Sequence, residues 1–559
     1  MFISSTAWVP ALRRLAGVGV LATAALTTSL LAPGSGLATA AAVPAGPTAV
    51  PAGVGGATVP ELNWRSCGRN APEGLRCAKV QVPLDYDRPQ GATTTLALAK
   101  LPAQKPADRI GSLFVNPGGP GGEARSFVPY AADLIGPVAR RRFDVIGIDP
   151  RGVGASTPAR CTLVDPDFPS FAFPFSRNQV RKQLRFGAQF REGCANTGNA
   201  ILDHMSTADT ARDMELIRQA VGDPQLTYYG ISYGSYLGAT YAAMFPDNVR
   251  ALIVDGVLDP VAWSTGRGDS GSKLPFSTRI GSGLGAAETL SSALTRCNEV
   301  GRQRCALAPN AHAKWNRMDS RLRQGPVRLD GRPFLYSDLI GYTLGAMYDA
   351  GSYRFLMRDL SGLHRAMFAS ASPKAGASAV ESLRELAERS QADRPGPWSP
   401  AGRSAVAGDQ VTVRAGFEGV ACSDSVNPSD PRAWIKAAAF DDRRGAGGFG
   451  RFWTWISSVC AQWPGSDADA FRGPWDVETS TPVLIVGNSH DPATPITGAV
   501  ALHEVMDSSR LVTMRGWGHG ALGASKCVTA IFNSYLANQA LPAADVSCQP
   551  NRPLYPAPR

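Results

Sequence analysis

The stretch "YYGISYGSYLGATYAAMFP", from Tyr228 to Pro246, places one serine between two glycines in a run otherwise typical of a buried strand followed by a buried helix. Gly230 and Gly234 each stand two residues from Ser232, which indicates a turn too tight for ordinary side chains. This is the G-x-S-x-G pattern of a nucleophile elbow. Because the chain has 59 glycines in 559 residues, one such match is not decisive. The rest of the sequence has to supply the other parts of the site.

Short apolar strands alternate with helical segments around this stretch. The segments "SLFVNPGGPGG", "FDVIGIDPRGVG", "LTYYGIS", "VRALIVDGVLDP" and "TPVLIVGNSHDPATP" each predict a strand that ends in a loop, and "TADTARDMELIRQAVG" has helical spacing. This alternation predicts an α/β protein with a mostly parallel central sheet and helices on both faces. Functional groups of such sheets gather in loops at the carboxyl ends of the strands, where Ser232, Asp491 and His519 are all expected.

The alternation of strands and helices stops in the middle of the chain. From about residue 261 to 474 the sequence contains helix-like pieces, several tryptophans and the glycine-rich segment "RRGAGGFG". We interpret this region as an inserted, mainly helical cap. The expected organisation is a signal peptide at 1–40, a flexible leader or pro-segment at 41–60, the first part of the core at 61–260, the cap at 261–474 and the second part of the core at 475–559.

The first forty residues have the pattern of an export signal. Arg13 and Arg14 precede an apolar, alanine-rich run, and Ala38-Thr39-Ala40 offers a small-residue cleavage site. No other stretch is long and apolar enough to span a bilayer. We therefore expect a secreted protein without a stable membrane anchor once the signal is removed.

The cysteines agree with export, because all ten lie beyond the signal segment and disulfides persist in oxidising compartments. Sequence alone cannot fix their connectivity. Their spacing suggests neighbouring partners: Cys67 with Cys77, Cys161 with Cys194, Cys297 with Cys305, Cys422 with Cys460, and Cys527 with Cys548. No C-x-x-C pair occurs, which argues against a zinc or redox site.

The net charge of +10 does not indicate a nucleic-acid partner. The basic residues are scattered among acidic ones rather than gathered in a stripe. We expect no nucleic acid, no metal and no cofactor.

A serine nucleophile needs a base and an acid that orients the base. His519 is the best base, because it follows the last predicted strand and glycines flank it in "GWGHGAL". His490 is the rival, but it is adjacent to Asp491 in sequence, and neighbouring side chains rarely face each other. Asp491 follows the strand "VLIVG" and is stiffened by Pro492. The order Ser232, Asp491, His519 is that of α/β-hydrolases.

A glycine loop, Gly118–Gly122, follows another predicted strand. Such a loop lets the backbone approach a substrate closely, so the N–H groups of Gly119 and Tyr233 are the expected oxyanion-hole donors. A phosphate-binding loop is the alternative, but no Lys-Ser/Thr pair follows.

Five segments together resemble the secreted bacterial tripeptidyl aminopeptidases, which are α/β-hydrolases related to the prolyl iminopeptidases. They are "FVNPGGPGG", "FDVIGIDPRGVGAS", "YYGISYGSYLGATYAAMFP", "VLIVGNSHDPATP" and "GWGHG". The resemblance runs from about Leu62 to Cys548 and is weakest in the cap. It implies a serine exopeptidase that removes short peptides, tripeptides in particular, from free N-termini. Glu123 departs from the small residue expected after the glycine loop; an acid there could disfavour an anionic intermediate or could bind a substrate amine.

An aminopeptidase has to recognise an ammonium group, and carboxylates do this best. In the cap, "FEGVACSDS" resembles the corresponding segment of that family, with Glu418 and Asp424 on either side of Cys422. These acids are the candidates for amine binding, together with Glu123. A pair of solvated acids beside a structural cystine is the alternative.

Two other functions remain open from the sequence. A secreted carboxylesterase acting on small esters would use the same catalytic residues, and only the cap would differ. A catalytically silent hydrolase fold could serve as a binding protein, although Ser232, Asp491 and His519 are all present. The oligomeric state and the exact length of the released peptide do not follow from the sequence.

Overall fold

The computed structural model describes residues 54–369, 373–392, 403–405 and 410–557. The expected signal peptide and most of the expected leader lie outside these residues. None of the described helices combines the length and the apolarity needed to cross a bilayer.

A ten-stranded sheet carries the fold, in the order β1-β2-β3-β5-β4-β7-β8-β13-β14-β15. The pairings among β1, β2, β3 and β5 are antiparallel, and all pairings from β5 to β15 are parallel, which confirms the mostly parallel sheet. Its strands are β1 (Arg65–Ser66), β2 (Arg76–Pro83), β3 (Thr93–Leu101), β4 (Gly111–Asn116), β5 (Phe143–Asp149), β7 (Leu226–Ile231), β8 (Val249–Asp255), β13 (Val483–His490), β14 (Ser509–Trp517) and β15 (Val546–Cys548).

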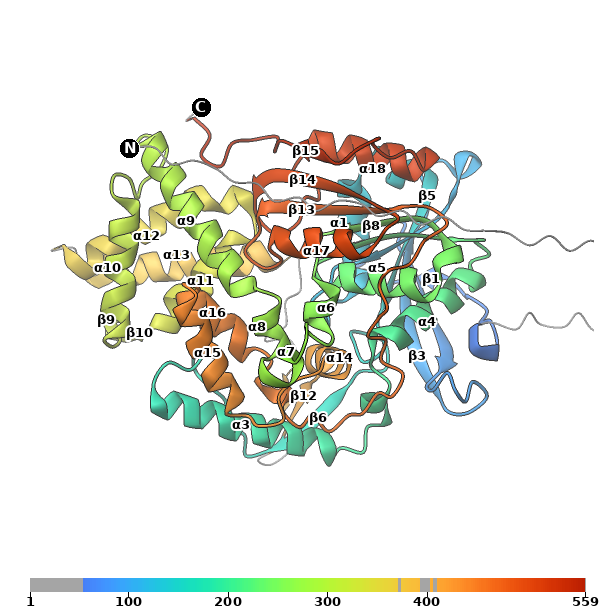
Figure 1. Ribbon diagram of the computed structural model, residues 1–559, viewed down its shortest axis with the longest axis horizontal. Helices are drawn as coiled ribbons and strands as arrows, with labels where there is room; N and C mark the ends of the chain where they lie inside the picture. Colours follow the sequence, from blue (N-terminus) through green and yellow to red (C-terminus); the bar gives the residue numbers. More distant parts are fainter. Residues whose placement is uncertain (1–53, 370–372, 393–402, 406–409, 558–559) are drawn as a thin grey trace, which may run out of the picture. The chain divides into compact units, whose positions relative to one another are not determined.

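Helices cover both faces of this sheet. The apolar cores on the two faces are distinct, because β4 and β7 are buried at every position and send alternate side chains to opposite sides. In Figure 1, α18 lies above β14 and α17 lies below β13. One face carries α1 (Ala124–Ile135), α2 (Pro137–Arg142) and α18 (Lys526–Asn538), and the other carries α4 (Thr207–Ala220), α5 (Tyr233–Met244) and α17 (Ile496–Val505).

The chain between β8 and β13 is mainly helical. Figure 1 shows α9 to α13 gathered beside the sheet rather than over it. The helices are α6 (Pro260–Trp263), α7 (Ser270–Lys273), α8 (Phe276–Arg279), α9 (Ser282–Val300), α10 (Ala311–Arg323), α11 (Tyr336–Met347), α12 (Tyr353–Phe368), α13 (Pro373–Ala392), α14 (Gly416–Asp424), α15 (Ala433–Arg443) and α16 (Gly447–Trp455). A hairpin of β9 (Val327–Leu329) and β10 (Arg332–Phe334) lies between α10 and α11.

One segment from the first part of the chain joins this region. β6 (Arg160–Val164) pairs antiparallel with β12 (Gln410–Arg414), which also pairs with β11 (Arg403–Ala405). β12 thereby has a partner along both edges, so neither edge is left without backbone hydrogen bonds. The helix that follows, α3 (Arg177–Ala195), packs on β6 and on the short turn Ser458–Cys460. Residues 160–195, expected in the core, therefore contribute to the insertion.

Five disulfides crosslink the described chain, and no cysteine is free within it. The pairs are those that the spacing suggests: Cys67–Cys77, Cys161–Cys194, Cys297–Cys305, Cys422–Cys460 and Cys527–Cys548. Each joins positions close in sequence, with separations from 8 to 38 residues. Such crosslinks typically stabilise a protein by ~2–4 kcal/mol each.

Candidate active site

Ser232 stands at the turn between β7 and α5 with φ 61° and ψ −127°, a conformation that L-residues rarely adopt. The flanking glycines are needed because the backbone passes too close for a side chain. A Cβ on Gly230 would lie 2.2 Å from the Gly234 carbonyl oxygen, and one on Gly234 would lie 2.8 Å from the Asn116 carbonyl oxygen. The Ser232 N–H donates to the Asp255 carbonyl at 2.9 Å, which ties the turn to the end of β8.

His519 and Asp491 form a buried pair. The His519 Nδ1 lies 3.0 Å from each carboxylate oxygen of Asp491. Asp491 also accepts hydrogen bonds from the N–H groups of Ala493, Thr494 and Gly520. Burial by itself would raise the pKa of Asp491, but the charge and hydrogen bond of His519 and these N–H donors outweigh it and hold the pKa below its ordinary value. Asp491 is therefore ionised and engages Nδ1, so that Nε2 is the ring nitrogen turned away from it.

The loop that carries His519 is fixed from several sides. The side-chain amide of Asn488 donates to the carbonyls of Gly518 and Gly520, at 2.8 and 2.7 Å. The His519 N–H donates to the Tyr348 carbonyl at 2.9 Å, and the Tyr348 ring meets the imidazole edge-on with centroids 5.0 Å apart. Since the position of the imidazole decides whether proton transfer can occur, these contacts are part of the site.

The glycine loop packs directly against the elbow. A Cβ on Gly118 would lie 2.8 Å from the backbone nitrogen of Tyr233. Tyr233 is the first residue of α5, so its N–H has no acceptor within the helix. The loop holds its shape through hydrogen bonds from Gly118 N–H to the Asn116 side chain and from Gly122 N–H to the Gly118 carbonyl.

Ser232, His519 and Gly119 all line one cavity of about 60 Å³. The insertion supplies seven of its fifteen lining residues, all with aromatic or aliphatic side chains: Trp263, Phe276, Ile280, Tyr348, Phe417, Trp453 and Ile456. The arrangement brings a hydroxyl, an imidazole oriented by a carboxylate and a glycine loop to one apolar cleft. It has the parts required for acyl transfer.

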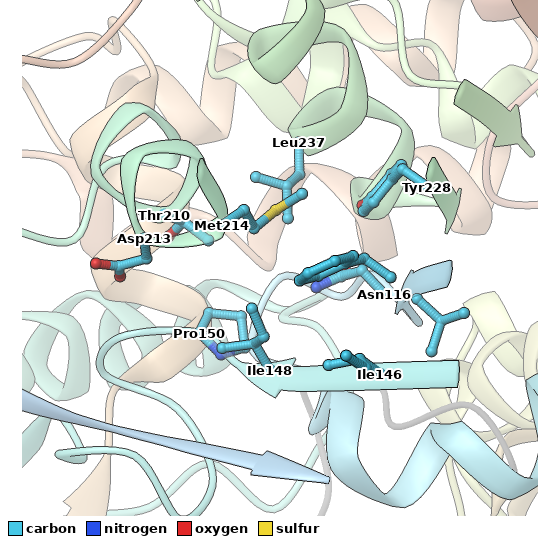
Figure 2. Close-up of a pocket in the computed structure, with 11 residues that line it drawn as sticks. Asn116, Ile146, Ile148, Pro150, Thr210, Asp213, Met214, Tyr228 and Leu237 are labelled. Carbon is cyan, nitrogen blue, oxygen red and sulfur yellow. The ribbon is translucent and has the colours of Figure 1, made fainter. Parts of the chain in front are cut away.

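A second, interior cavity lies deeper in the fold, between α4 and the strands β4, β5 and β7. Figure 2 shows the labelled side chains that surround it, among them Asn116, Asp213 and Tyr228. Its volume of about 10 Å³ is roughly that needed by a single water molecule, so it cannot hold a substrate.

Glu418 is on α14 and directly follows Phe417, which lines the cavity, but Glu418 is not itself among the lining residues. The N-terminus of α14 rests on the glycine loop, since a Cβ on Gly121 would lie 3.0 Å from the Phe417 nitrogen. Burial raises the pKa of Glu418 to about 7, against a smaller lowering by its own backbone N–H. The side chain remains partly exposed. Within the described residues, no ion pair offsets the cost of burying this carboxylate.

The other two acids have partners within the protein. Asp424 is 1% exposed and accepts hydrogen bonds from the Thr207 N–H and hydroxyl, at 2.7 Å each, and from the Trp263 indole at 3.2 Å. Glu123 is exposed and lies 3.6 Å from the Arg414 guanidinium. None of the three acids, Glu123, Glu418 and Asp424, lines the 60 Å³ cavity.

Two residues that contact His519 were not predicted from the sequence. The Thr494 hydroxyl lies 3.2 Å from the His519 Nδ1, and its place three residues after Asp491 in "DPATP" is a signal that could have found it. Tyr348 lies in the insertion, far in sequence from every motif, and no local sequence pattern identifies it as a neighbour of His519. The decoy His490 stacks on Trp517 with centroids 4.7 Å apart and is not among the residues that line the cavity.

Comparisons with known proteins agree with this geometry. The family described as alpha/beta hydrolase fold matches residues 111–278, and the family described as TAP-like protein matches residues 446–548. A tripeptidyl aminopeptidase of Streptomyces lividans is 29% identical over 88% of this chain and 87% of its own length. In Mycobacterium tuberculosis H37Rv, carboxylesterase B is 31% identical over 88% of this chain and 90% of its own, and serine protease Hip1 is 30% identical over 87% and 91%.

The sheet order and the position of the serine elbow define an α/β-hydrolase, and the chain is a serine hydrolase. Relatives at 30–31% identity extend over most of its length. The chain belongs to the tripeptidyl aminopeptidase family within that class, and it is a serine peptidase.

Proposed function

We propose that this protein is an exported aminopeptidase that releases short peptides, tripeptides in particular, from free N-termini. The observation that carries the proposal is that Ser232 and the Asp491–His519 pair meet at one cleft roofed by the insertion. The names of the relatives and the five disulfides support it as well.

In the proposed mechanism, the Ser232 Oγ attacks the carbonyl carbon of the scissile bond. The His519 Nε2 takes the serine proton and passes it to the leaving amine as the C–N bond breaks, while Asp491 stabilises the imidazolium. The N–H groups of Gly119 and Tyr233 donate to the oxyanion. A water molecule, deprotonated by His519, then attacks the acyl-enzyme and releases the peptide and the serine.

We assign recognition of the substrate ammonium to Glu418. It directly follows Phe417 of the cavity wall, forms no ion pair within the described residues, and has a pKa raised to about 7, so an ammonium group would supply the missing partner. The oxygens of Asp424 are already engaged by Thr207 and Trp263, and Glu123 faces Arg414. An anchor at a fixed distance from Ser232 would limit the number of residues before the scissile bond.

Substitution of the nucleophile tests the reaction class. Ser232→Ala should lower kcat by roughly 10⁶-fold and abolish labelling by a fluorophosphonate. His519→Ala should be similarly severe, whereas His490→Ala, the matched control, should be mild. A folded His490→Ala variant that loses more activity than His519→Ala would refute the assignment of the base. An unlabelled wild-type protein would instead favour the silent binding protein.

Acetylation of the substrate tests the aminopeptidase. Blocking the amine of a tripeptide anilide should lower kcat/KM at least ~10-fold, the value of a modest charge-assisted hydrogen bond. Glu418→Gln should remove most of that difference. Equal rates on both anilides would remove the aminopeptidase assignment.

A carboxylesterase is the second candidate, because a relative of that name is 31% identical to this chain. It would use the same Ser232, His519 and Asp491. Strong hydrolysis of a small aryl ester with no cleavage of either anilide would establish the esterase in place of the peptidase.

A further inference from the structure

A larger cavity, of about 610 Å³, adjoins His519. It shares Tyr348 and His519 with the 60 Å³ cavity but does not include Ser232. We call it the His519 groove; its wall comes from Tyr130 and Leu134 of α1 and from parts of residues 348–355, 514–524 and 550–556. Its volume is within the range of about 300–1,000 Å³ that is usual for ligand sites. The groove is therefore large enough to hold part of a substrate.

Two arginines and one aspartate line the His519 groove, and they differ in whether they have partners within the protein. Arg354 and Arg552 line it and are exposed, and neither has an ion-pair partner within the described residues. Its acid, Asp349, accepts hydrogen bonds from the Gly351 N–H at 3.0 Å and the Ser352 hydroxyl at 3.1 Å. The Arg354 guanidinium lies over the Phe355 ring, 5.4 Å from its centroid, but neither arginine is neutralised by a carboxylate of the described residues, so both can accept a carboxylate ligand.

The same groove has an apolar part. The Phe355 ring is 41% exposed and lies in the wall together with Leu522 and Pro553. The Arg354 and Arg358 guanidinium groups lie within 5.4 Å of the centroid of this ring. An exposed aromatic ring beside Arg354, which has no ion-pair partner in the described residues, offers contacts for a peptide with both apolar and acidic side chains.

His519 determines which part of a substrate reaches this groove. In serine hydrolases the imidazole protonates the leaving amine, so the chain that follows the scissile bond departs along the histidine. We propose that the His519 groove binds the segment after the scissile bond, and that Arg354 and Arg552 select substrates with a carboxylate there. This inference rests on the proposed peptidase function. The carboxylate can come from an acidic side chain or from the C-terminus of a short peptide.

The test compares peptides that share one N-terminal tripeptide and differ only after the scissile bond. One pair carries Asp or Asn at the second and third positions after the bond, with an amidated C-terminus. Another pair carries Asn and ends in a free acid or an amide, which separates the two sources of the carboxylate. A tripeptide anilide, which has no residues after the bond, reports on catalysis alone.

The wild-type protein should prefer Asp over Asn by ~3- to 10-fold in kcat/KM, as expected for one or two exposed ion pairs. The double variant Arg354→Gln/Arg552→Gln should reduce this ratio to about 1, as should high salt. Arg141→Gln, an exposed arginine on α2 outside the groove, makes a similar charge change and should leave the ratio unaltered.

The outcomes separate this inference from the function beneath it. If the protein hydrolyses the anilide but cleaves all the peptides equally, the groove does not select carboxylates, and the peptidase proposal is unaffected. A preference for carboxylates that survives in the double variant would likewise overturn the role of the groove alone. Failure to cleave the anilide and every peptide would overturn the peptidase proposal, and the groove with it.

Discussion

At the scale of single residues, the site depends on close backbone approaches and on burial of charge. Ser232 occupies a strained conformation that typically costs about 1–3 kcal/mol and that persists only where the surroundings enforce it. Here the Asp255 carbonyl and the adjacent glycine loop enforce it. Glu418 is the clearest case of buried charge: it has no ion-pair partner among the described residues, and burial raises its pKa to about 7.

Gly234→Ala should destabilise the protein and lower activity. The new methyl group would lie 2.8 Å from the Asn116 carbonyl oxygen, and such overpacking typically costs ~1–3 kcal/mol. Gly187→Ala in α3 is the matched control: its Cβ would approach only the flexible Arg191 guanidinium, at 3.4 Å, and alanine favours a helix by ~1 kcal/mol. Chemical denaturation of both variants measures the difference. A Gly234→Ala variant with unchanged stability would contradict the close backbone approach inferred at this turn.

The pH dependence of cleavage should report the ionisation of the Glu418 carboxyl. Its folded pKa is raised, so the carboxylate that would bind an ammonium forms as the pH rises through about 7. The ratio of kcat/KM for a free-amine peptide to kcat/KM for a small aryl ester should therefore rise over that interval. It should fall again above ~8, where the peptide amine loses its proton. Taking the ratio cancels groups that both reactions share.

Glu418→Gln should flatten that rise and leave the ester profile unchanged. An identical rise in the variant would show that another group titrates.

At the scale of elements, α14 links the insertion to the catalytic core. Its N-terminus rests on the glycine loop, and the Cys422–Cys460 disulfide ties it to the segment that includes Trp453 and Ile456 of the cleft. The position of Glu418 relative to Ser232 therefore depends on contacts made by the whole helix.

Removing that crosslink with Cys422→Ser/Cys460→Ser should lower stability by ~2–4 kcal/mol and raise KM for free-amine peptides more than for aryl esters. Cys297→Ser/Cys305→Ser, which opens a disulfide between α9 and the turn after it, should affect stability without that difference in KM. Thermal melts and steady-state kinetics of both variants make the comparison. Equal effects on the two classes of substrate would show that α14 keeps its place without the disulfide.

At the scale of the whole molecule, Arg151 connects distant parts of the chain. Its side chain is fully buried and forms ion pairs with Asp209 at 3.1 Å and Asp213 at 2.7 Å on α4. It also donates to the carbonyls of Pro83 and Leu84 at the end of β2. The "DPRGVG" motif thus joins β5, α4 and the first hairpin through one guanidinium.

Arg151→Met should destabilise the protein by about 3–5 kcal/mol, because it leaves the buried Asp213 without its cation and Asp209 with only the more exposed Arg212 as an arginine partner. Arg212→Met removes a partner of the same Asp209 from a more exposed position and should cost less than about 1 kcal/mol. Urea denaturation of the two variants tests the contrast. A small effect of Arg151→Met would show that Asp209 and Asp213 are held by their other partners.

The sequence predicted the sheet, the helices on its faces and the pairing of cysteines correctly, because these depend on local patterns. Apolar runs such as "VLIVG" predict buried parallel strands, and cysteines close in sequence can reach each other without long-range information. It did not predict that β6 pairs with β12, since their pairing joins residues about 250 positions apart. Short strands with mixed polarity also give little periodic signal.

What the sequence determined by itself is the class of chemistry, together with the candidate residues for it. Ser232, Asp491 and His519 follow strands of a parallel sheet, and the carboxyl ends of such strands meet at one edge. Only the tertiary structure decided the surroundings of these residues. It engaged Asp424 with Thr207 and Trp263, gave Glu418 no ion-pair partner among the described residues, and set Arg354 and Arg552 in a groove beside His519. The reason is physical: burial and charge pairing arise from contacts between segments far apart in the chain, which local sequence does not encode.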